Sequence, residues 1–336
     1  MAIRSIRSLS VASLLFAVVV LALSPTSSAQ SSIDEIHVVP RVAVESPTRE
    51  IDASLDAHTK PIKKEVDLVL VPVTITDPMD RLVIGLEQDN FQVFDGKQPQ
   101  EIKHFSSEDT PVSLGVIFDM SGSMKSKIEQ AREAVGEFLK TANPQDEFFI
   151  ITFADQPEEV SDFTSSVEDI QSQLLYTLPK GRTALLDAIY MGLSKMRRAK
   201  YARKALLIIS DGGDNHSRYT QGEIESTVKE SDVAVYAVGI YDRYFATQEE
   251  MLGPGLLERI AELTGGRSFT IENPNDLSRV ARTIGSALRN QYVLGYSPRN
   301  LERNGKWRKI KVKLRLSKRL PPLHVYVKTG YYAPSE

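Results

Sequence analysis

The chain has 336 residues, of which 41% are hydrophobic and 25% are charged, and its formal net charge is -3 at pH 7. This composition indicates a globular protein of about two domains and excludes collagen-like and low-complexity chains. The absence of cysteine excludes disulfide scaffolds, cysteine-ligated zinc, iron–sulfur clusters and thiol nucleophiles, and the balanced charge argues against a nucleic-acid-binding protein.

The first 29 residues have the three parts of a secretory signal peptide. Arg4 and Arg7 precede an apolar run from Val11 to Leu23, and small residues follow up to Ala29. This run is shorter than the roughly 20 residues that span a bilayer. We therefore expect residues 1–29 to be cleaved and the protein to be exported, to the periplasm or outside the cell, with an uncleaved N-terminal anchor as the alternative. No later run approaches that length, so no membrane span is expected after cleavage.

Two segments of different texture follow the signal peptide. Residues 30–60 are rich in Ser, Pro, Thr and charge without a sustained period, which predicts a flexible linker. Residues 61–110 are expected to form the first part of a β-rich unit. Its dense apolar runs predict strands at 66–75, 81–85, 91–94 and 102–105.

Residues 111–290 alternate buried-strand runs with helical periods. Strands are predicted at 112–118, 147–153, 205–209 and 233–239, and apolar stripes at helical spacing lie in 128–139, 185–196, 256–263 and 277–288. Strands that are apolar on both faces and alternate with amphipathic helices indicate a parallel sheet covered on both sides. The expected fold class is therefore α/β, with a doubly wound, mainly parallel sheet.

Residues 291–336 return to strands. Ile310, Val312 and Leu314 alternate with basic residues at a period of two, and 323–327 repeats the pattern. We expect this tail to pair with 61–110 in one flanking β-sandwich, so that the α/β domain is inserted between the two parts of the sandwich.

Basic residues cluster in two segments of the chain. The strip Lys306–Arg319 is interpreted first as an exposed strand face that discourages edge-to-edge pairing, with contact to an anionic envelope polymer or lipid surface as the alternative. Lys195, with the cations at 197, 198 and 200, ends a helix and suits the helix dipole. Asp187 is interpreted as a helix first-turn acid or a hydrogen-bonding support, and Asp214 as a loop residue, with a place at the rim of the site as the alternative.

Oxygen-bearing side chains follow two predicted strands and open one helix; they are Asp119, Ser121, Ser123, Thr183 and Asp211. In a doubly wound sheet such positions meet at the carboxyl ends of the strands, where strand order reverses. Donors that are all oxygens favour Mg²⁺, with Mn²⁺ or Ca²⁺ as alternatives, over zinc or copper. Two carboxylates and three neutral hydroxyls are expected to leave the ion under-compensated, so that a vacant position attracts an anionic oxygen from a partner.

The series Asp119-x-Ser121-x-Ser123, followed by Thr183 and Asp211, resembles the metal-ion-dependent adhesion site of the von Willebrand factor type A (VWA) domain, over about residues 110–290. The resemblance implies a Rossmann-like fold and direct ligation by the two serines. It implies that the threonine ligates directly or through water, that the aspartates act mostly through water, and that a protein partner supplies a Glu or Asp carboxylate. The flanking segments are similar to exported bacterial "VWFA-related" proteins.

Three functions are compatible with this pattern. The first is a non-enzymatic binding or adhesion protein that uses the metal to recognise a partner, with loops at 155–182, 212–220 and 241–254 supplying specificity. The second is a structural envelope component whose metal only stabilises the fold. The third, a metal-dependent hydrolase, is disfavoured because Ser121 stands where a second acid would be needed and no Gly-x-Ser-x-Gly elbow is present.

Overall fold

The computed structural model describes residues 68–175, 178–241, 248–316 and 321–335. The predicted signal peptide (1–29) and linker (30–60) lie outside the described residues. Within the described ranges, no helix combines the length and the apolar character needed to cross a bilayer.

The centre of the α/β region is a six-stranded sheet with the order β10-β9-β8-β5-β6-β7. All neighbouring strands are parallel except β7, which runs antiparallel to β6. The strands are β5 (Val112–Asp119), β6 (Glu147–Phe153), β7 (Pro157–Thr164), β8 (Arg203–Ser210), β9 (Val233–Ile240) and β10 (Ser268–Ile271). Every residue of β5 is buried, as expected of a central strand that is covered on both faces.

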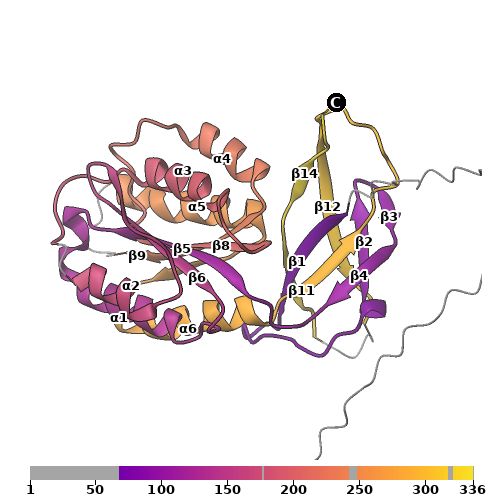
Figure 1. The fold of residues 1–336 in the computed structure, drawn as a ribbon, viewed down its shortest axis with the longest axis horizontal. Coiled ribbons are helices and arrows are strands. Elements are labelled where there is room, and N and C mark those ends of the chain that lie inside the picture. Colours follow the sequence, from indigo (N-terminus) through magenta and orange to yellow (C-terminus); the bar gives the residue numbers. More distant parts are fainter. Residues whose placement is uncertain (1–67, 176–177, 242–247, 317–320, 336) are drawn as a thin grey trace, which may run out of the picture. The chain divides into compact units, whose positions relative to one another are not determined.

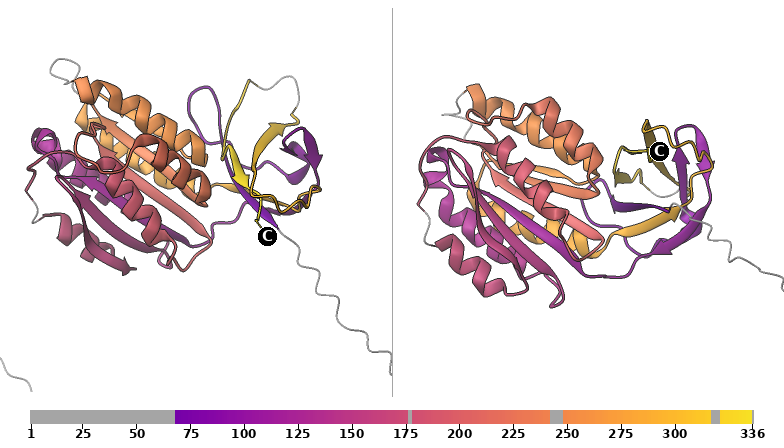
Figure 2. Two further views of the ribbon diagram at one scale, coloured as in Figure 1. Left: turned by 90° about the horizontal axis from the view of Figure 1, so that it is seen from above. Right: turned by 45° about the horizontal axis from the view of Figure 1, so that its top comes forward.

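Helices cover both faces of this sheet (Figures 1 and 2). One face packs against α1 (Ile128–Leu139), α2 (Val167–Leu175) and α6 (Leu277–Arg289). The other packs against α3 (Leu185–Met196), α4 (Gln221–Glu230) and α5 (Gln248–Thr264). Two separate apolar clusters, one on each side of the sheet, confirm the predicted doubly wound α/β class.

The segments before and after the α/β region form two four-stranded sheets, with the orders β13-β1-β11-β4 and β14-β12-β2-β3. The strands that precede the α/β region are β1 (Val69–Thr76), β2 (Phe91–Asp95), β3 (Gln98–Gln100) and β4 (Ile102–Ser106). Those that follow it are β11 (Tyr292–Tyr296), β12 (Trp307–Leu314), β13 (His324–Val327) and β14 (Gly330–Tyr332). Each sheet therefore takes strands from both ends, and one apolar cluster joins them, which confirms the expected flanking sandwich.

The lysine-rich strand β12 lies between β14 and β2 and is hydrogen-bonded on both sides. The pairing with β14 covers Trp307–Lys309 and the pairing with β2 covers Ile310–Leu314, so β12 is an interior strand of its sheet and the interpretation that the whole strip marks a free edge is wrong. The error arose because period-two alternation shows which residues face solvent but not which strands flank them.

Other expectations from the sequence also need correction. The predicted strand at 81–85 is reduced to one bridge, between Leu82 and Thr76. Strand β7 and helix α2 occupy 157–175, which the sequence left unassigned. Other elements that the sequence left unassigned are β3, β10, β11, β14 and the short 3-10 helices η1 (Gln88–Asn90), η2 (Gly122–Ser126) and η3 (Pro274–Asp276). Lys195 lies in the last turn of α3, as expected, but it is also buried: its ammonium lies 2.6 Å from Glu159 Oε1 and 2.5 Å from Asp162 Oδ1, both on β7.

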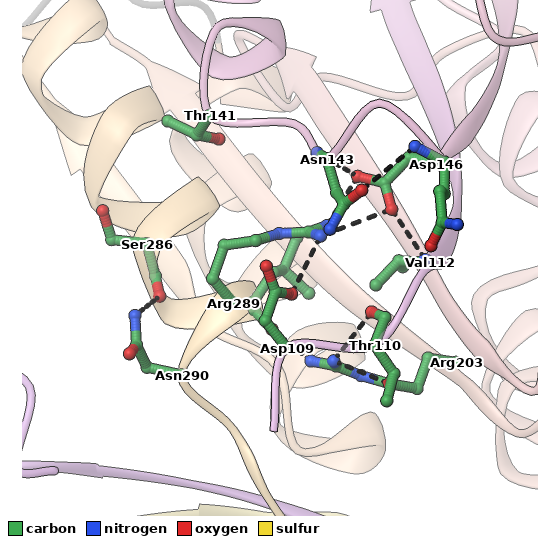
Figure 3. A network of polar contacts seen from close by, with 12 residues as sticks. Asp109, Thr110, Val112, Thr141, Asn143, Asp146, Arg203, Ser286, Arg289 and Asn290 are labelled. Carbon is green, nitrogen blue, oxygen red and sulfur yellow. Dashed lines mark hydrogen bonds and ion pairs between the residues drawn. The ribbon is translucent and has the colours of Figure 1, made fainter. Parts of the chain in front are cut away.

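A polar network ties the start of β5 to the end of α6 (Figure 3). Arg289, the last residue of α6, pairs with Asp109 at 3.1 Å and with the buried Asp146 at 2.8 Å. Asp146 Oδ1 also accepts a hydrogen bond from the backbone N–H of Val112 at 2.8 Å. The chain therefore enters and leaves the α/β region at one place, which is what allows an inserted domain to be flanked by a sandwich built from both ends.

Candidate functional site

The candidate site lies where the strand order of the central sheet reverses. After β5 the chain adds β6 on one side, whereas β8 pairs with the other side of β5. The loops that leave β5 and β8 therefore diverge, and a crevice of this kind is where doubly wound folds bind ligands. The pairing of Phe118 with Ile209 sets the ends of the two strands side by side.

The loop after β5 brings three of the predicted oxygens together. Asp119 is buried, and its Oδ1 accepts a hydrogen bond from the backbone N–H of Ser121 at 2.8 Å. The hydroxyls of Ser121 and Ser123 are 3.0 Å apart. Ser121 is buried but Ser123 is exposed, so the group opens to solvent on the side of Ser123.

The loop before α3 docks onto this first loop. The backbone N–H of Gly122 donates to the carbonyl of Gly181 at 3.1 Å, and that of Lys180 donates to Met120 at 2.8 Å. Gly181 has a φ of 82°, and a Cβ there would lie 2.6 Å from a carboxylate oxygen of Asp155, so the close approach requires glycine.

Thr183 lies two residues after the docked Gly181, and its backbone is fixed by the loop that follows β8. Its backbone N–H donates to Asn215 Oδ1 at 3.0 Å, and its carbonyl accepts from the N–H groups of Asn215 and His216. The side chain is almost fully buried. Thr183 is therefore fixed between the loops that follow β5 and β8.

Asp211, the fifth predicted residue, follows β8 and is buried beside Asp119. Burial first, and then the nearby carboxylate of Asp211, raise the pKa of Asp119 to about 7. Two carboxylates that oppose each other's ionisation in a buried place favour a cation between them or next to them. The structure thus brings the predicted acids together.

Two further residues support the site, and the sequence analysis missed them. Ser210 donates its hydroxyl to Asp119 Oδ2 at 2.5 Å and accepts from the N–H of Gly212 at 2.9 Å. Lys127 places its ammonium 3.6 Å from Asp211 Oδ2 and donates to the carbonyl of Ile240 at 3.2 Å. The position of Ser210 at a strand end was a usable signal, whereas nothing in the local sequence links Lys127 to β8.

Tyr241 closes the site on a further side. Its hydroxyl is buried and makes no hydrogen bond within the described residues, and a Cβ added at Gly212 would lie 2.6 Å from it. Burial and the nearby carboxylate of Asp211 raise the pKa of Tyr241. A neutral phenol, with a proton to donate, therefore lies next to the acid.

Two other acids in this region have structural partners. Asp214 accepts from the N–H groups of Leu185 and Leu186 at 2.9 and 3.3 Å, so it caps the start of α3 from another loop. Asp187 accepts from the N–H groups of Arg218 and Tyr219 at 2.8 and 3.1 Å, and so anchors the segment before α4.

The donors at this place suit a hard divalent cation. Among the described residues, no group of three or more His, Cys, Asp or Glu side chains is placed so that it could hold a metal ion. The place where the strand order reverses offers two carboxylates and neighbouring hydroxyls. Mg²⁺ accepts such a set because it binds through few carboxylates and keeps several waters.

Comparison with known proteins identifies the region that holds these residues. Residues 114–213 match the family described as von Willebrand factor type A domain. Inter alpha-trypsin inhibitor heavy chain 4 of Mus musculus is 28% identical over 190 residues, which are 52% of this chain and 20% of that protein. The magnesium-chelatase 67 kDa subunit of Chlorobaculum tepidum is 28% identical over 194 residues, which are 53% of this chain and 31% of that protein.

Both of these curated relatives are therefore much longer than the matched region.

Among solved structures, a protein described as von Willebrand factor type A from Catenulispora acidiphila superposes with a TM-score of 0.48 at 13% identity, over 81% of this chain and 74% of that one.

Proposed function

Because residues 114–213 form a von Willebrand factor type A domain, we propose that this chain is an exported, non-enzymatic binding protein that holds Mg²⁺ and recognises an acidic residue of a protein partner. The observation that supports the proposal is a chain of contacts where the strand order reverses: Asp119 with Ser121 and Asp211, and Ser121 with Ser123. The backbone of Thr183 is fixed by hydrogen bonds to the loop after β8. Mn²⁺ or Ca²⁺ would suit the same oxygens.

Each residue has a role in the proposed site. Ser121 and Ser123, whose hydroxyls already face each other, would bind the ion directly, and Thr183 would bind it directly or through water. Both carboxylate oxygens of Asp119 accept hydrogen bonds, from Ser121 and Ser210, which suits a role through bridging water. Asp211 would act in the same way.

The charges explain why such a site would take an acidic ligand. The ion supplies two positive charges and an affinity for anionic oxygen, and the two aspartates formally balance those charges. Lys127, 3.6 Å from Asp211, adds a further positive charge, so the loaded group has an excess of one. In a half-buried place, where electrostatic interactions are stronger than in water, that excess favours a carboxylate from outside.

The rim offers contacts that could select the partner. Ser123 and Gly122 are exposed, and Arg182, whose side chain is 61% exposed, extends from the loop that docks on them. The segments predicted to supply specificity are 155–182, 212–220 and 241–254, of which 176–177 and 242–247 lie outside the described residues. We propose that partner specificity lies in these loops.

A first experiment tests the metal. Calorimetric titration of the metal-free protein with Mg²⁺ should give binding that Asp119→Ala and Ser121→Ala abolish or weaken at least about tenfold, since each removes a ligand or its support. Asp169→Ala is the matched control, because Asp169 is an exposed carboxylate in the first turn of α2. Equal affinity in all variants would reject the site.

A second experiment tests the partner. Immobilised protein is incubated with an envelope extract in Mg²⁺ and eluted with EDTA, and the eluted proteins are identified. The proposal requires at least one protein that is lost with Asp119→Ala and whose acidic residue is needed. If Mg²⁺ raises the melting temperature but EDTA and Asp119→Ala leave every captured protein in place, the metal only stabilises a structural component.

A third measurement addresses catalysis and export. Turnover of generic phosphate or ester substrates that Asp119→Asn abolishes would overturn the non-enzymatic assignment. Export is tested by cell fractionation of the full chain and of a variant without residues 2–29. We expect only the full chain to leave the cytoplasm.

A further inference from the structure

Strand β12 places three lysines in a row on the outer face of its sheet. Lys309, Lys311 and Lys313 are exposed, whereas the residues between them, Ile310 and Val312, are buried in the sandwich core. Residues two apart on a strand are about 6.7 Å apart, so the row spans about 13 Å. Like charges this close repel each other, and lysine has a low strand propensity, so the row does not favour folding.

The neighbouring strands supply no compensating charge on this face. In antiparallel pairing, directly opposite residues share a face. Opposite the lysines stand Gly330, Phe94 and Gln92, none of which is charged. Within the part of the chain that the structure describes, none of the three lysines has an ion-pair partner, and their one recorded side-chain contact is Lys313 Nζ over the Phe94 ring, at 5.1 Å.

The two ends of the row differ. At one end Trp307 and Tyr332 lie opposite each other on the same face, with ring centroids 5.0 Å apart in an edge-to-face arrangement, and Tyr332 is 39% exposed. At the other end Arg315 lines a groove together with Asp89 and Glu101, so its charge has acids nearby. We name the set Trp307, Lys309, Lys311, Lys313 and Tyr332 the lysine face.

We propose that the lysine face binds the surface of a membrane that contains anionic lipids. Lysines act as point charges without the fork that fits a particular phosphate, which suits many mobile headgroups. Tryptophan and tyrosine favour the boundary between headgroups and acyl chains, because each has an apolar body and a polar atom. This surface is separate from the candidate metal site and does not depend on it.

A linear polyanion fits these observations less well. Single-stranded nucleic acids are held by aromatic rings with free faces on which bases stack. Here the aromatic pair is engaged with itself, edge to face.

The expected strength follows from the charge. Each lysine near an anionic leaflet contributes about 1 kcal/mol, or about a fivefold gain in binding, so three lysines give on the order of a 100-fold gain. Salt screens the effect, because the Debye length falls from about 14 Å at 50 mM to about 4 Å at 500 mM.

The test uses the full chain and vesicles of phosphatidylcholine, with or without about one third phosphatidylglycerol. Sedimentation should show that the natural chain binds the anionic vesicles. At 50 mM salt, the triple variant Lys309→Gln/Lys311→Gln/Lys313→Gln should bind them about 100-fold more weakly, and at 500 mM salt this difference should disappear. The triple variant Lys103→Gln/Lys200→Gln/Lys229→Gln changes the net charge equally and should bind as the natural chain does. Urea denaturation checks that both variants fold.

A second readout reports on the face itself. Trp307 is the single tryptophan of the chain, so its emission should shift to shorter wavelength with anionic vesicles and stay unchanged with phosphatidylcholine alone. The apolar N-terminal run is the same in all variants and cannot produce a difference between them. Equal binding by both triple variants, an unshifted Trp307, or tighter lysine-dependent binding to heparin than to the vesicles would overturn the proposal.

Discussion

Asp119 shows how one buried residue joins the fold to the site. Its carboxylate accepts hydrogen bonds from Ser121 and Ser210, and so links the loop after β5 to the end of β8. Burial and the neighbouring Asp211 nevertheless oppose its ionisation. The same carboxylate therefore orders the loop and makes the metal-free site unfavourable at neutral pH, a conflict that a bound cation would remove.

The raised pKa of Asp119 predicts a pH dependence of stability. Its pKa is about 7 in the folded chain against an ordinary value of 3.8, so the folded state keeps a proton that the unfolded state releases. This contribution is complete below about pH 4 and is lost as the pH rises through about 7, at up to roughly 1.4 kcal/mol per pH unit. Urea denaturation in EDTA should therefore show the free energy of unfolding falling over this range, relative to Asp119→Asn.

The comparison with Asp119→Asn is needed because other acids act in the opposite direction. Hydrogen bonds and charge from Lys140 and Arg282, for example, lower the pKa of Glu137. If the two stability curves run parallel between pH 4 and 8, the ionisation of Asp119 does not govern this part of the pH profile.

Lys127 yields a prediction on metal affinity. Its ammonium lies 3.6 Å from Asp211 Oδ2, so it repels a divalent ion at the proposed site. Lys127→Met keeps the length of the side chain and removes the charge, and should tighten Mg²⁺ binding about tenfold in calorimetry. Lys125→Met, at an exposed position of the preceding 3-10 helix, is the control. Unchanged or weaker binding by Lys127→Met alone would show that the lysine does not compete with the ion.

At the scale of elements, β7 is the antiparallel exception in the central sheet, and a buried lysine secures it. Lys195 reaches from α3 to Glu159 and Asp162, and its ammonium lies over the rings of Phe149 and Phe163 at 5.4 and 5.2 Å. The pairing of β7 with β6 is also irregular in register. Side-chain contacts with α3 therefore supplement a weak hydrogen-bond ladder.

We expect Lys195→Met to destabilise the protein by about 1–2 kcal/mol, because the cation is buried while both acids are partly exposed and can be solvated. Urea denaturation measures the loss of stability, and the rate of amide hydrogen exchange should increase most in β7. Arg197→Met, an exposed cation at the end of the same helix, should change stability by less than about 0.5 kcal/mol. Equal effects of the two substitutions would mean that Lys195 merely suits the helix dipole.

At the scale of the whole molecule, the sandwich depends on both ends of the chain. The neighbours of strand β1 in its sheet are β11 and β13, which come about 220 and 250 residues later in the sequence. Contacts of this range must wait for the α/β region to bring the two ends together. The network of Arg289, Asp109 and Asp146 does so at the base of that region (Figure 3).

A chain that stops at residue 290 should therefore lose the sandwich but keep the central sheet. It would leave β1 without partners and expose core residues such as Val71 and Val93, so we expect strong binding of an apolar dye and concentration-dependent aggregation. Helical circular dichroism and Mg²⁺ binding should persist. A cooperative loss of helix together with the sandwich would show that the two regions fold as one unit.

Much of this fold was accessible from the sequence because its signals are local. Apolar runs that alternate with helical stripes predicted the parallel sheet. Local signals also mark helix ends: Gly265, with a φ of 77°, follows α5, and the Asn273 side chain accepts from Asn275 at the start of η3. The donor types of Asp119, Ser121, Ser123, Thr183 and Asp211 were also readable, since oxygen chemistry depends on residue identity.

Only the tertiary structure decided which segments became neighbours. Strand β12 became an interior strand because β14 and β2 flank it, and Lys127 came to Asp211, and Lys195 to β7, across large sequence separations. Such contacts depend on how whole elements pack, and a buried charge is stable only where packing supplies its partners. Periodicity and residue type determined what each segment is, and packing determined what each segment touches.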